Sequence, residues 1–384
     1  MNIYHQFQSM IFVKMKIINF DNNATTKVSK DVLEKINDVY GCCGNSSSNH
    51  KLGRKSAMII EDARQELSDS LNASNYEIYF TSGGTEANNM AFFSDKYDTI
   101  LFSKIEHSSV YNTRPENSSI IEFEVDHNCQ ANIEDIKRKV AEYKGKNFLL
   151  SLMYANSETG VIQNIKEVAK IVHSCGGLIH SDLVQAFGKI DIDLEDLNLD
   201  FASVSAHKIN GPQGVGALIV RRGIDIKPLI YGGGHERGKR SGTLNTPGIA
   251  GFGEACKKVK EKLQQNENVR TIRDYLENEI KNIAKNDIMI FAGNAPRVAN
   301  TCYMSLKNSD SQTALIFFDL KNIMISAGSA CSSGSTKPSR VLEAMKIPKE
   351  FLGSMRISLC SDNTLEEAKE FIETFKEFYY KTRK

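Results

Sequence analysis

The sequence predicts an α/β fold in which helices cover both faces of a mostly parallel sheet, followed by a smaller α+β domain. In the middle of the chain, short apolar segments alternate with helical patterns, which is typical of β–α–β units. Residues 148–153 form a largely apolar run, as expected for a strand that is buried on both faces. After about residue 285 the pattern changes to short strands accompanied by two helices, which indicates the second domain.

The first part of the chain supplies the strands of the large sheet and the helices between them. A helix over residues 165–175 is expected because apolar residues recur on one face and a glycine follows. Thr246 and Pro247 open another helical pattern, which continues to about residue 285. The expected strands are residues 76–80, 99–103, 148–153, 178–180, 201–204 and 217–220, with a helix from about residue 86.

The last part of the chain predicts a domain of its own. We expect a large domain over residues 17–260 and a small one over 261–384, which the N-terminal segment 1–28 joins. The strands expected in the small domain are residues 288–291, 301–305, 323–326 and 356–359, with helices over 311–320 and 365–379.

Composition excludes several classes of protein. The chain has 384 residues, of which 41% are hydrophobic and 25% charged, and this is ordinary for a globular protein. A formal net charge of +1 gives no sign of binding to nucleic acid or to an anionic membrane. No apolar run approaches the ~20 residues of a membrane helix. The eight cysteines are scattered and form no CxxC pair, so we expect no structural zinc and a reduced, cytoplasmic protein.

The most informative residue is Lys208, at the end of the sequence Ser-Ala-His-Lys that begins at Ser205. It follows the apolar run 201–204 and precedes the glycine-rich turn 211–216. Burying a lysine costs free energy, so an amine placed here is expected to form a covalent bond or to pair with a charge. The leading interpretation is a Schiff base with pyridoxal 5'-phosphate (PLP). A surface lysine at a strand end explains the four residues equally well.

A second motif is the turn at residues 81–89, which follows a strand and opens a helix. Free backbone N–H groups and the helix dipole make such a junction a site for an anion, and the glycines allow close approach. The Thr85 hydroxyl adds a donor. A phosphate is the expected guest, although an ordinary capped helix is the alternative.

Two further polar residues follow predicted strands. Asp182 ends the strand that begins at residue 178, where α/β sheets bind their ligands, and it suits a protonated pyridine nitrogen. A helix cap explains Asp182 equally well. His107 follows the strand 99–103 and is placed to stack on a cofactor ring, whereas most lone histidines have no such role.

The second half of the chain adds a thiol, an arginine and a basic loop. Cys331 stands among small residues in the segment 326–335, where a mobile thiol can act as a nucleophile. Arg356, on the last apolar strand, suits a forked pair with a carboxylate, and a surface ion pair is the alternative. The glycine-rich loop 232–243 offers Thr243 and basic residues to a phosphate or a carboxylate, unless it is an ordinary solvent loop.

Taken in chain order, these segments resemble the cysteine desulfurases of the class V aminotransferase superfamily, which are PLP enzymes of fold type I. The resemblance covers nearly the whole chain, from Phe20 to about Ser358. Each motif has modest specificity, whereas the ordered set is very specific. The segments that carry the resemblance are residues 20–26, 44–50, 81–89, 106–107, 205–216, 232–243 and 326–333.

The resemblance implies roles at the cofactor. Lys208 is the lysine that bonds PLP and shuttles a proton, while Asp182 pairs with the pyridine nitrogen. His107 stacks on the ring, and Gln185 bonds the phenolic oxygen of the ring. The implied phosphate ligands are Gly84, Thr85, Ser205 and His207, with Thr243 arriving from the second subunit of a homodimer.

The resemblance also implies how the substrate is handled. Arg356 binds the carboxylate of L-cysteine, with Asn22 or Asn23 nearby. Cys331 is the nucleophile that becomes a persulfide, and it transiently carries sulfur or contacts a nascent cluster. No resident metal is expected.

One position departs from the family pattern. The family reads Asn-Asn-Glu where this chain has Asn156, Ser157 and Glu158. The second asparagine of that pattern contacts the cofactor. Because Ser157 is shorter, this contact has three possible fates here. The contact is lost, is relayed by water, or is taken by Asn156.

The implied function is an L-cysteine desulfurase that passes sulfur to an acceptor protein or an iron–sulfur scaffold, for cluster assembly or tRNA thiolation. A selenocysteine lyase, another class V PLP enzyme or a weakly active homologue are the alternatives. Cys331 argues against an aminotransferase, which needs no thiol. A selenocysteine lyase would use the same site.

Overall fold

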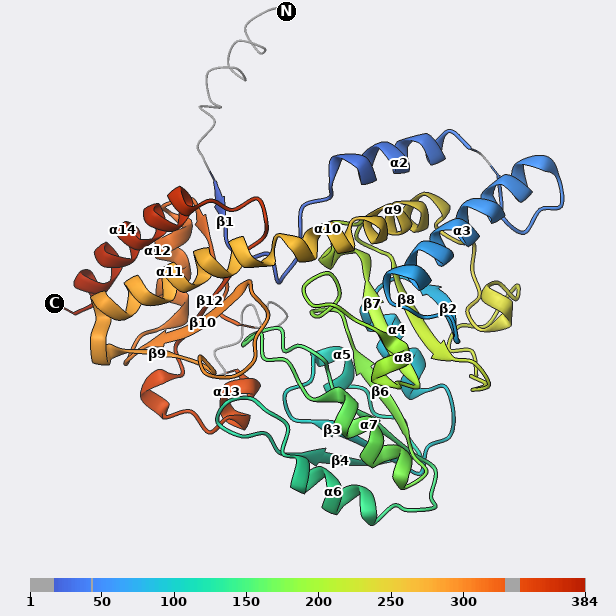
Figure 1. The fold of residues 1–384 in the computed structure, drawn as a ribbon, viewed down its shortest axis with the longest axis horizontal. Helices are drawn as coiled ribbons and strands as arrows, with labels where there is room; N and C mark the ends of the chain where they lie inside the picture. Colours follow the sequence, from blue (N-terminus) through green and yellow to red (C-terminus); the bar gives the residue numbers. More distant parts are fainter. Residues whose placement is uncertain (1–16, 43, 329–338, 384) are drawn as a thin grey trace, which may run out of the picture.

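The computed structural model describes residues 17–42, 44–328 and 339–383 (Figure 1). Its largest sheet has seven strands in the order β2-β8-β7-β6-β5-β3-β4. The strands are β2 (Tyr76–Thr81), β3 (Thr99–Ser103), β4 (Ser119–Phe123), β5 (Phe148–Ser151), β6 (Leu178–Asp182), β7 (Phe201–Ser205) and β8 (Gly216–Arg221).

The large sheet is mostly parallel, as predicted. Strands β4, β3, β5, β6 and β7 run parallel to one another, and only β8 pairs antiparallel, with β7 on one side and β2 on the other. A short connection cannot carry the chain back for a parallel pairing. The segment between Ser205 and Gly216, which pair directly, therefore turns the chain at one end of the sheet. Lys208 lies in this turn.

Helices cover both faces of the large sheet because successive strand residues point to opposite sides. In β5, Leu150 packs with the helices on one face and Leu149 with those on the other. The helices of the first face include α3 (Lys51–Ser70), α6 (Ile133–Ala141), α7 (Ile165–Ser174) and α9 (Thr246–Lys257). The opposite face carries α4 (Gly84–Phe92) and α5 (Ser108–Tyr111).

A second, antiparallel sheet has the order β12-β10-β9. Its strands are β9 (Ile288–Ile290), β10 (Thr301–Leu306) and β12 (Ser354–Ser358), and its helices are α11 (Asn266–Ala284), α12 (Ser311–Asp319) and α14 (Leu365–Thr382). Beside it, β1 (Ile18–Asn19) pairs parallel with β11 (Ile323–Met324). Phe318 of α12 stacks on Phe371 of α14, with ring centroids 5.0 Å apart.

The remaining helices connect these parts. They are α2 (Lys30–Tyr40), α8 (Leu194–Leu197), α10 (Val259–Gln264) and α13 (Arg340–Ala344). The helical pattern predicted from Thr246 to about residue 285 forms three successive helices, α9, α10 and α11, which lead from one sheet to the other (Figure 1). The breaks fall at Lys258 and Gln265, both close to helical backbone angles, so periodicity alone did not reveal them. None of the helices in the described ranges has the length and apolar character needed to span a membrane.

The apolar residues gather in separate clusters. One cluster packs around the large sheet and includes Val32 and Val259, whereas another packs around the second sheet and includes Ile18, Phe20 and Val269. These clusters support, as a proposal, the domain boundary near residue 260 and the place of the N-terminal segment with the small domain.

The contact between α3 and α9 generates the first prediction. A Cβ atom added at Gly253 of α9 would lie 2.7 Å from the Cα and 2.8 Å from the Cβ of Ala63 on α3. We expect Gly253→Ala to lower the free energy of unfolding by about 1–3 kcal/mol, because the helices must separate. Helix propensity alone would favour alanine by about 1 kcal/mol. Urea unfolding measures the change.

Gly293→Ala is the matched control, because a Cβ there has its nearest neighbours at 3.9 Å. A Gly253→Ala variant at least as stable as wild type would contradict the expected cost of separating the helices.

Candidate active site

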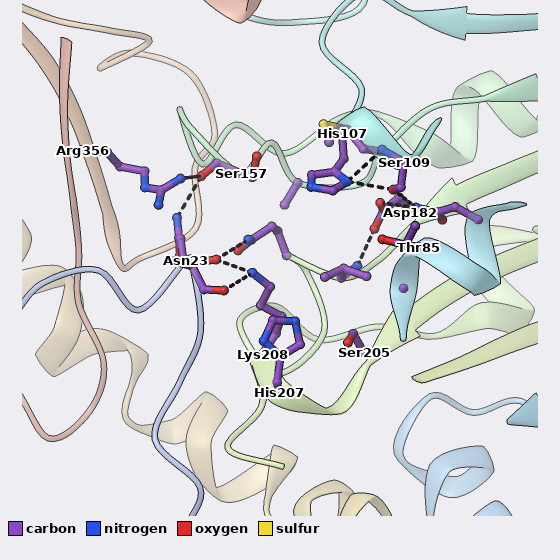
Figure 2. A pocket seen from close by; sticks show the side chains of 17 residues that line it. Asn23, Thr85, His107, Ser109, Ser157, Asp182, Ser205, His207, Lys208 and Arg356 are labelled. Carbon is purple, nitrogen blue, oxygen red and sulfur yellow. Dashed lines mark hydrogen bonds between the residues drawn. The ribbon is translucent and has the colours of Figure 1, made fainter. Parts of the chain in front are cut away.

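A cavity of about 260 Å³ lies at the carboxyl ends of β6 and β7, next to the first turn of α4 (Figure 2). This end of a parallel sheet is where α/β proteins bind their ligands. The structure brings most of the predicted site residues together here. The cavity is lined by Asn23, Ala24, Gly84, Thr85, Asn88, His107, Ser109, Met153, Ala155, Ser157, Asp182, Val184, Gln185, Ser205, His207, Lys208 and Arg356.

Lys208 ends the short 3₁₀ turn η1 (Ala206–Lys208), which follows β7 directly. Its Nζ donates to the backbone oxygen of Ala24 at 2.8 Å and to that of Asn23. Both acceptors belong to the N-terminal segment, so the lysine is positioned by a part of the chain far from it in sequence.

The N-terminus of α4 suits a phosphate. Gly83 precedes the helix without a side-chain cap, and Gly84 and Thr85 of the first turn line the cavity. A Cβ on Gly84 would lie 2.8 Å from Cγ2 of Val184, which explains the glycine. Burial, and then the charge of Lys208, lower the pKa of His207 to about 4, so this imidazole is neutral near pH 7.

Asp182 ends β6 and is 5% exposed. Its Oδ2 accepts from Nδ2 of Asn88 at 2.8 Å, and its Oδ1 accepts from the backbone N–H of Val184 at 2.9 Å. Both carboxylate oxygens therefore accept hydrogen bonds from the protein. A buried carboxylate facing the cavity fits a protonated ring nitrogen.

His107 is linked to Asp182 through two residues that the sequence analysis did not assign (Figure 2). Nδ1 of His107 accepts from the backbone N–H of Ser109 at 3.2 Å, so the neutral ring carries its proton on Nε2. The Ser109 hydroxyl lies 2.7 Å from the same Nδ1 and accepts from Nδ2 of Asn88 at 2.8 Å. Asn88 thereby joins His107 to Asp182. A helical spacing of one turn from Thr85 was the only sequence signal for Asn88.

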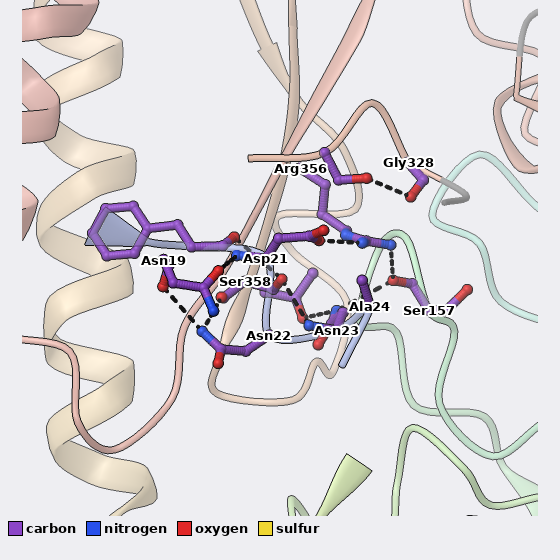
Figure 3. Close-up of polar contacts among 12 residues, drawn as sticks. Asn19, Asp21, Asn22, Asn23, Ala24, Ser157, Gly328, Arg356 and Ser358 are labelled. Atoms are coloured by element: carbon purple, nitrogen blue, oxygen red, sulfur yellow. Dashed lines mark hydrogen bonds and ion pairs between the residues drawn. The ribbon is translucent and has the colours of Figure 1, made fainter. Parts of the chain in front are cut away.

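Arg356 lies on β12 and is 2% exposed (Figure 3). Its Nη2 pairs with Oδ1 of Asp21 at 2.7 Å, and its Nη1 donates to the backbone oxygen of Ser157 at 3.0 Å. Its Nε is buried without a partner in the described part of the chain. Since a guanidinium has five N–H groups, donors remain for a ligand.

Asn22 does not line this cavity, and the expectation for it is corrected. Its Nδ2 donates to the backbone oxygens of Asn19 and Ser358, at 3.1 and 3.0 Å, on the other side of the segment (Figure 3). The neighbouring Asn23 faces the cavity instead. Residues 22–24 form a turn, in which the backbone N–H of Ala24 donates to the oxygen of Asp21 at 3.1 Å, and within this turn the two asparagines bond to different partners.

The comparisons with known proteins agree with this geometry. A family model for class V aminotransferases matches residues 18–371. Cysteine desulfurase IscS of Methanosarcina thermophila is 35% identical over 381 residues, which cover 96% of this chain and 93% of that protein. The chain belongs to the cysteine desulfurases of the class V aminotransferase family.

Further relatives cover the same length of chain. A cysteine desulfurase of Bradyrhizobium diazoefficiens is 37% identical over 371 residues, which cover 92% of each chain. A NifS-like protein from Rickettsia africae matches with a TM-score of 0.88 and 36% identity, over 95% of this chain and 99% of that one. A structure titled SspA in complex with cysteine matches with a TM-score of 0.77 and 29% identity, over 91% and 100%. These findings confirm the predicted family and fold class.

The departure from the desulfurase pattern at Ser157 can be placed in this cavity. Ser157 lines it, and its backbone oxygen accepts from Arg356 and, at 3.2 Å, from Nδ2 of Asn23. Asn156 is 1% exposed and does not line the cavity. Its Oδ1 accepts from the backbone N–H groups of Glu158 and Thr159 at 3.0 and 2.9 Å. Asn156 is therefore committed to its own turn, which argues against its taking the cofactor contact.

Thr243, like Asn22, is not among the described residues that line the cavity. Thr243 is exposed, and its contact with a second subunit stays a prediction. Cys331 lies outside the described residues, so its role also stays a prediction.

Glu106, next to His107, is a buried carboxyl that the sequence analysis did not assign. It is 1% exposed, its Oε1 accepts from the backbone N–H of Met153 at 2.7 Å, and its Oε2 has no partner among the described residues. Burial, with a smaller contribution from the charge of Asp182, raises the pKa of Glu106 to about 8. The carboxyl is therefore largely protonated at neutral pH.

Glu106 generates the second prediction. Because its pKa rises on folding, the folded chain keeps a proton that the unfolded chain loses above its ordinary value of 4.5. The wild type should therefore lose stability as the pH rises from 5 to 8, and Glu106→Gln should remove part of this loss. We expect the stability of the variant relative to wild type to rise by at least about 1 kcal/mol over this range.

Urea unfolding at several pH values measures the effect. Glu116→Gln, at an exposed position, is the control and should follow the wild type. Parallel curves for wild type and Glu106→Gln would contradict the assignment.

Proposed function

We propose that this chain is an L-cysteine desulfurase that uses PLP to convert L-cysteine to L-alanine, leaving sulfur on Cys331. The observation that carries the proposal is the convergence of Lys208, Asp182, His107 and the α4 N-terminus on one cavity. The names of the relatives, which are 35–37% identical over nearly the whole chain, support the same activity.

The residues of the cavity fit PLP in its separate chemical parts. The first turn of α4, with Ser205 and His207, would hold the phosphate, and Asp182 would keep the ring nitrogen protonated. Gln185 lies on the cavity wall with its Nε2 2.9 Å from the backbone oxygen of Asn23, in reach of the phenolic oxygen. When bound, PLP supplies an aldehyde that bonds to amines and a ring that withdraws electrons from the substrate Cα.

The protein supplies the proton transfers and the substrate contacts. Nζ of Lys208, once released from the cofactor, would take the proton from the Cα of L-cysteine. Arg356 would bind the substrate carboxylate through its remaining N–H groups, including the buried Nε. The carbonyls of Asn23 and Ala24 would hold the Lys208 amine in place between these steps.

The sulfur step is assigned to Cys331 from the sequence. Its thiolate would attack Sγ of the substrate, forming an S–S bond while the Cβ–Sγ bond breaks. The electrons of the broken bond remain on Cβ, which then takes a proton, so the products are L-alanine and a persulfide. The persulfide would pass its sulfur to an acceptor protein or an iron–sulfur scaffold.

The assembly and location complete the proposal. We infer a homodimer in which Thr243 contacts the phosphate in the partner subunit. A cytoplasmic location stays a prediction of the sequence.

Two variants separate cofactor binding from sulfur transfer. Purified protein with PLP should show a band near the visible edge and release sulfide and alanine from L-cysteine. Lys208→Ala should abolish both the band and turnover. Cys331→Ala should keep the band and lower sulfide release at least about 100-fold, because the nucleophile is lost. Absorbance and product assays measure both effects.

A wild type that gains no band with added PLP would overturn the proposed function. Full turnover by Cys331→Ala would overturn only the assignment of the nucleophile. Cys175→Ala is the matched control, because this cysteine lies outside the cavity.

Ser157→Asn tests the departure from the family pattern. The backbone contacts of Ser157 with Asn23 and Arg356 are kept, while a longer amide enters the cavity. We expect the Kd for PLP to fall several-fold, because a donor is restored at a position where Asn156 cannot supply it. Titration of PLP into the apo protein measures this, and an unchanged Kd would show that the contact is already replaced.

A further inference from the structure

Lys189 lies behind the wall of the candidate active site. With Lys208 and Lys262 it lines a second, smaller cavity of about 60 Å³. Its Nζ donates to Oε1 of Gln185 at 2.6 Å and to Oδ1 of Asn23 at 2.7 Å. Both acceptors line the main cavity, so Lys189 contacts the site without lining it.

The contact with Lys189 orients the Gln185 amide. Nζ of Lys189 donates to the oxygen of the Gln185 amide, so the oxygen is the end of this amide that faces the amine. The NH₂ group of Gln185 must then point away from Lys189, where one hydrogen is donated to the backbone oxygen of Asn23. The second hydrogen is left for the cavity.

The same amine orients Asn23. Oδ1 of Asn23 accepts from Lys189 and, at 3.0 Å, from Nδ2 of Asn300. The Asn23 amide nitrogen consequently faces Oγ1 of Thr301 at 2.9 Å and the backbone oxygen of Ser157. The backbone oxygen of Asn23 is also an acceptor for Lys208, so Lys189 supports the residue that holds the reactive amine.

Burying the amine of Lys189 opposes folding, because the amine loses its contact with water. Burial, followed by the charges of Lys208 and Arg356, lowers the pKa of Lys189 well below its ordinary value. In the part of the chain that the structure describes, its polar contacts are amide oxygens, and no carboxylate pairs with it. Such a cost is retained where the group serves a site.

We propose that Lys189 is a positioning residue of the cofactor site, which holds the NH₂ group of Gln185 toward the cavity and the Asn23 carbonyl against Lys208. The inference rests on the proposed function, because the NH₂ group would donate to the phenolic oxygen of the bound cofactor ring. Without Lys189 the Gln185 amide keeps only its bond to the backbone oxygen of Asn23, and an amide that turned over would place its oxygen toward that anion.

The test is a double-mutant cycle on PLP binding to the apo protein, followed by the visible band. We expect Lys189→Met to raise the Kd for PLP about tenfold in the wild-type background. In the Gln185→Ala background the same change should alter the Kd by less than about twofold, because the group through which Lys189 acts is absent. Equal effects in both backgrounds would overturn the proposal.

A spectroscopic readout distinguishes positioning from general destabilisation. Loss of the oriented Gln185 donor at the ring oxygen should raise the pH at which the visible band titrates by about one unit in Lys189→Met. The other charged groups that face this region, Lys208, Arg356 and Asp182, are unchanged in every variant. An unshifted midpoint together with an unchanged Kd would also overturn the proposal.

Lys262→Met is the matched control. Lys262 lines the same small cavity but donates to the backbone oxygen of Ile209 and contacts neither Gln185 nor Asn23. The Kd of the Lys262→Met variant for PLP should stay within about twofold of the wild-type value. If Lys189→Met fails to fold, Lys189→Gln, which is neutral and too short to reach both oxygens, has the same expected results.

Failure of the two proposals can be told apart. A wild type that does not bind PLP overturns the proposed function. A wild type that binds PLP while Lys189→Met binds it equally well overturns only the role of Lys189.

Discussion

The structure of the site depends on the N-terminal segment 18–26, which bonds to β12 of the smaller sheet and to the turn that holds Lys208. The backbone N–H of Asn22 donates to the Ser358 oxygen at 3.1 Å, and that of Thr26 donates to the His207 oxygen at 3.0 Å. Between these anchors, the carbonyls of Asn23 and Ala24 accept from Lys208. Because the segment is short, the sheet of β9, β10 and β12 and the Lys208 turn are held close together, and the cavity forms between them.

Positive charge is the second constraint on this region. Arg356 is paired with Asp21. Lys189 is instead buried against amide oxygens, close to Lys208 and Arg356. Burying cations near one another opposes folding, and the opposing free energy falls when anionic groups bind. A phosphate, a phenolic oxygen and a substrate carboxylate are such groups. The same charges that cost stability in the free protein therefore favour the ligands proposed for it.

The wall of the cavity that carries His107 and Asp182 is held together by hydrogen bonds through two uncharged side chains, Ser109 and Asn88. The chain of hydrogen bonds from His107 through Ser109 and Asn88 to Asp182 fixes the orientation of each polar group. In a region of low dielectric constant such a chain stiffens the site, and breaking one member leaves its neighbours unpaired. His107 and Asp182 are consequently expected to respond together to changes at either end.

The sequence by itself determined the alternation of strands and helices, and with it the positions of Lys208, Thr85 and Asp182 at strand ends. These features are local, because a strand end and a helix start are encoded by a few neighbouring residues, and a parallel sheet brings such ends to one edge. The choice of Asn23 over Asn22 was decided only by the tertiary structure. Both asparagines lie in a turn, and the bond of Asn22 to Ser358, 336 positions away, leaves Asn23 to line the cavity. Lys189 and the bridge through Asn88 and Ser109 likewise became visible only when distant segments met.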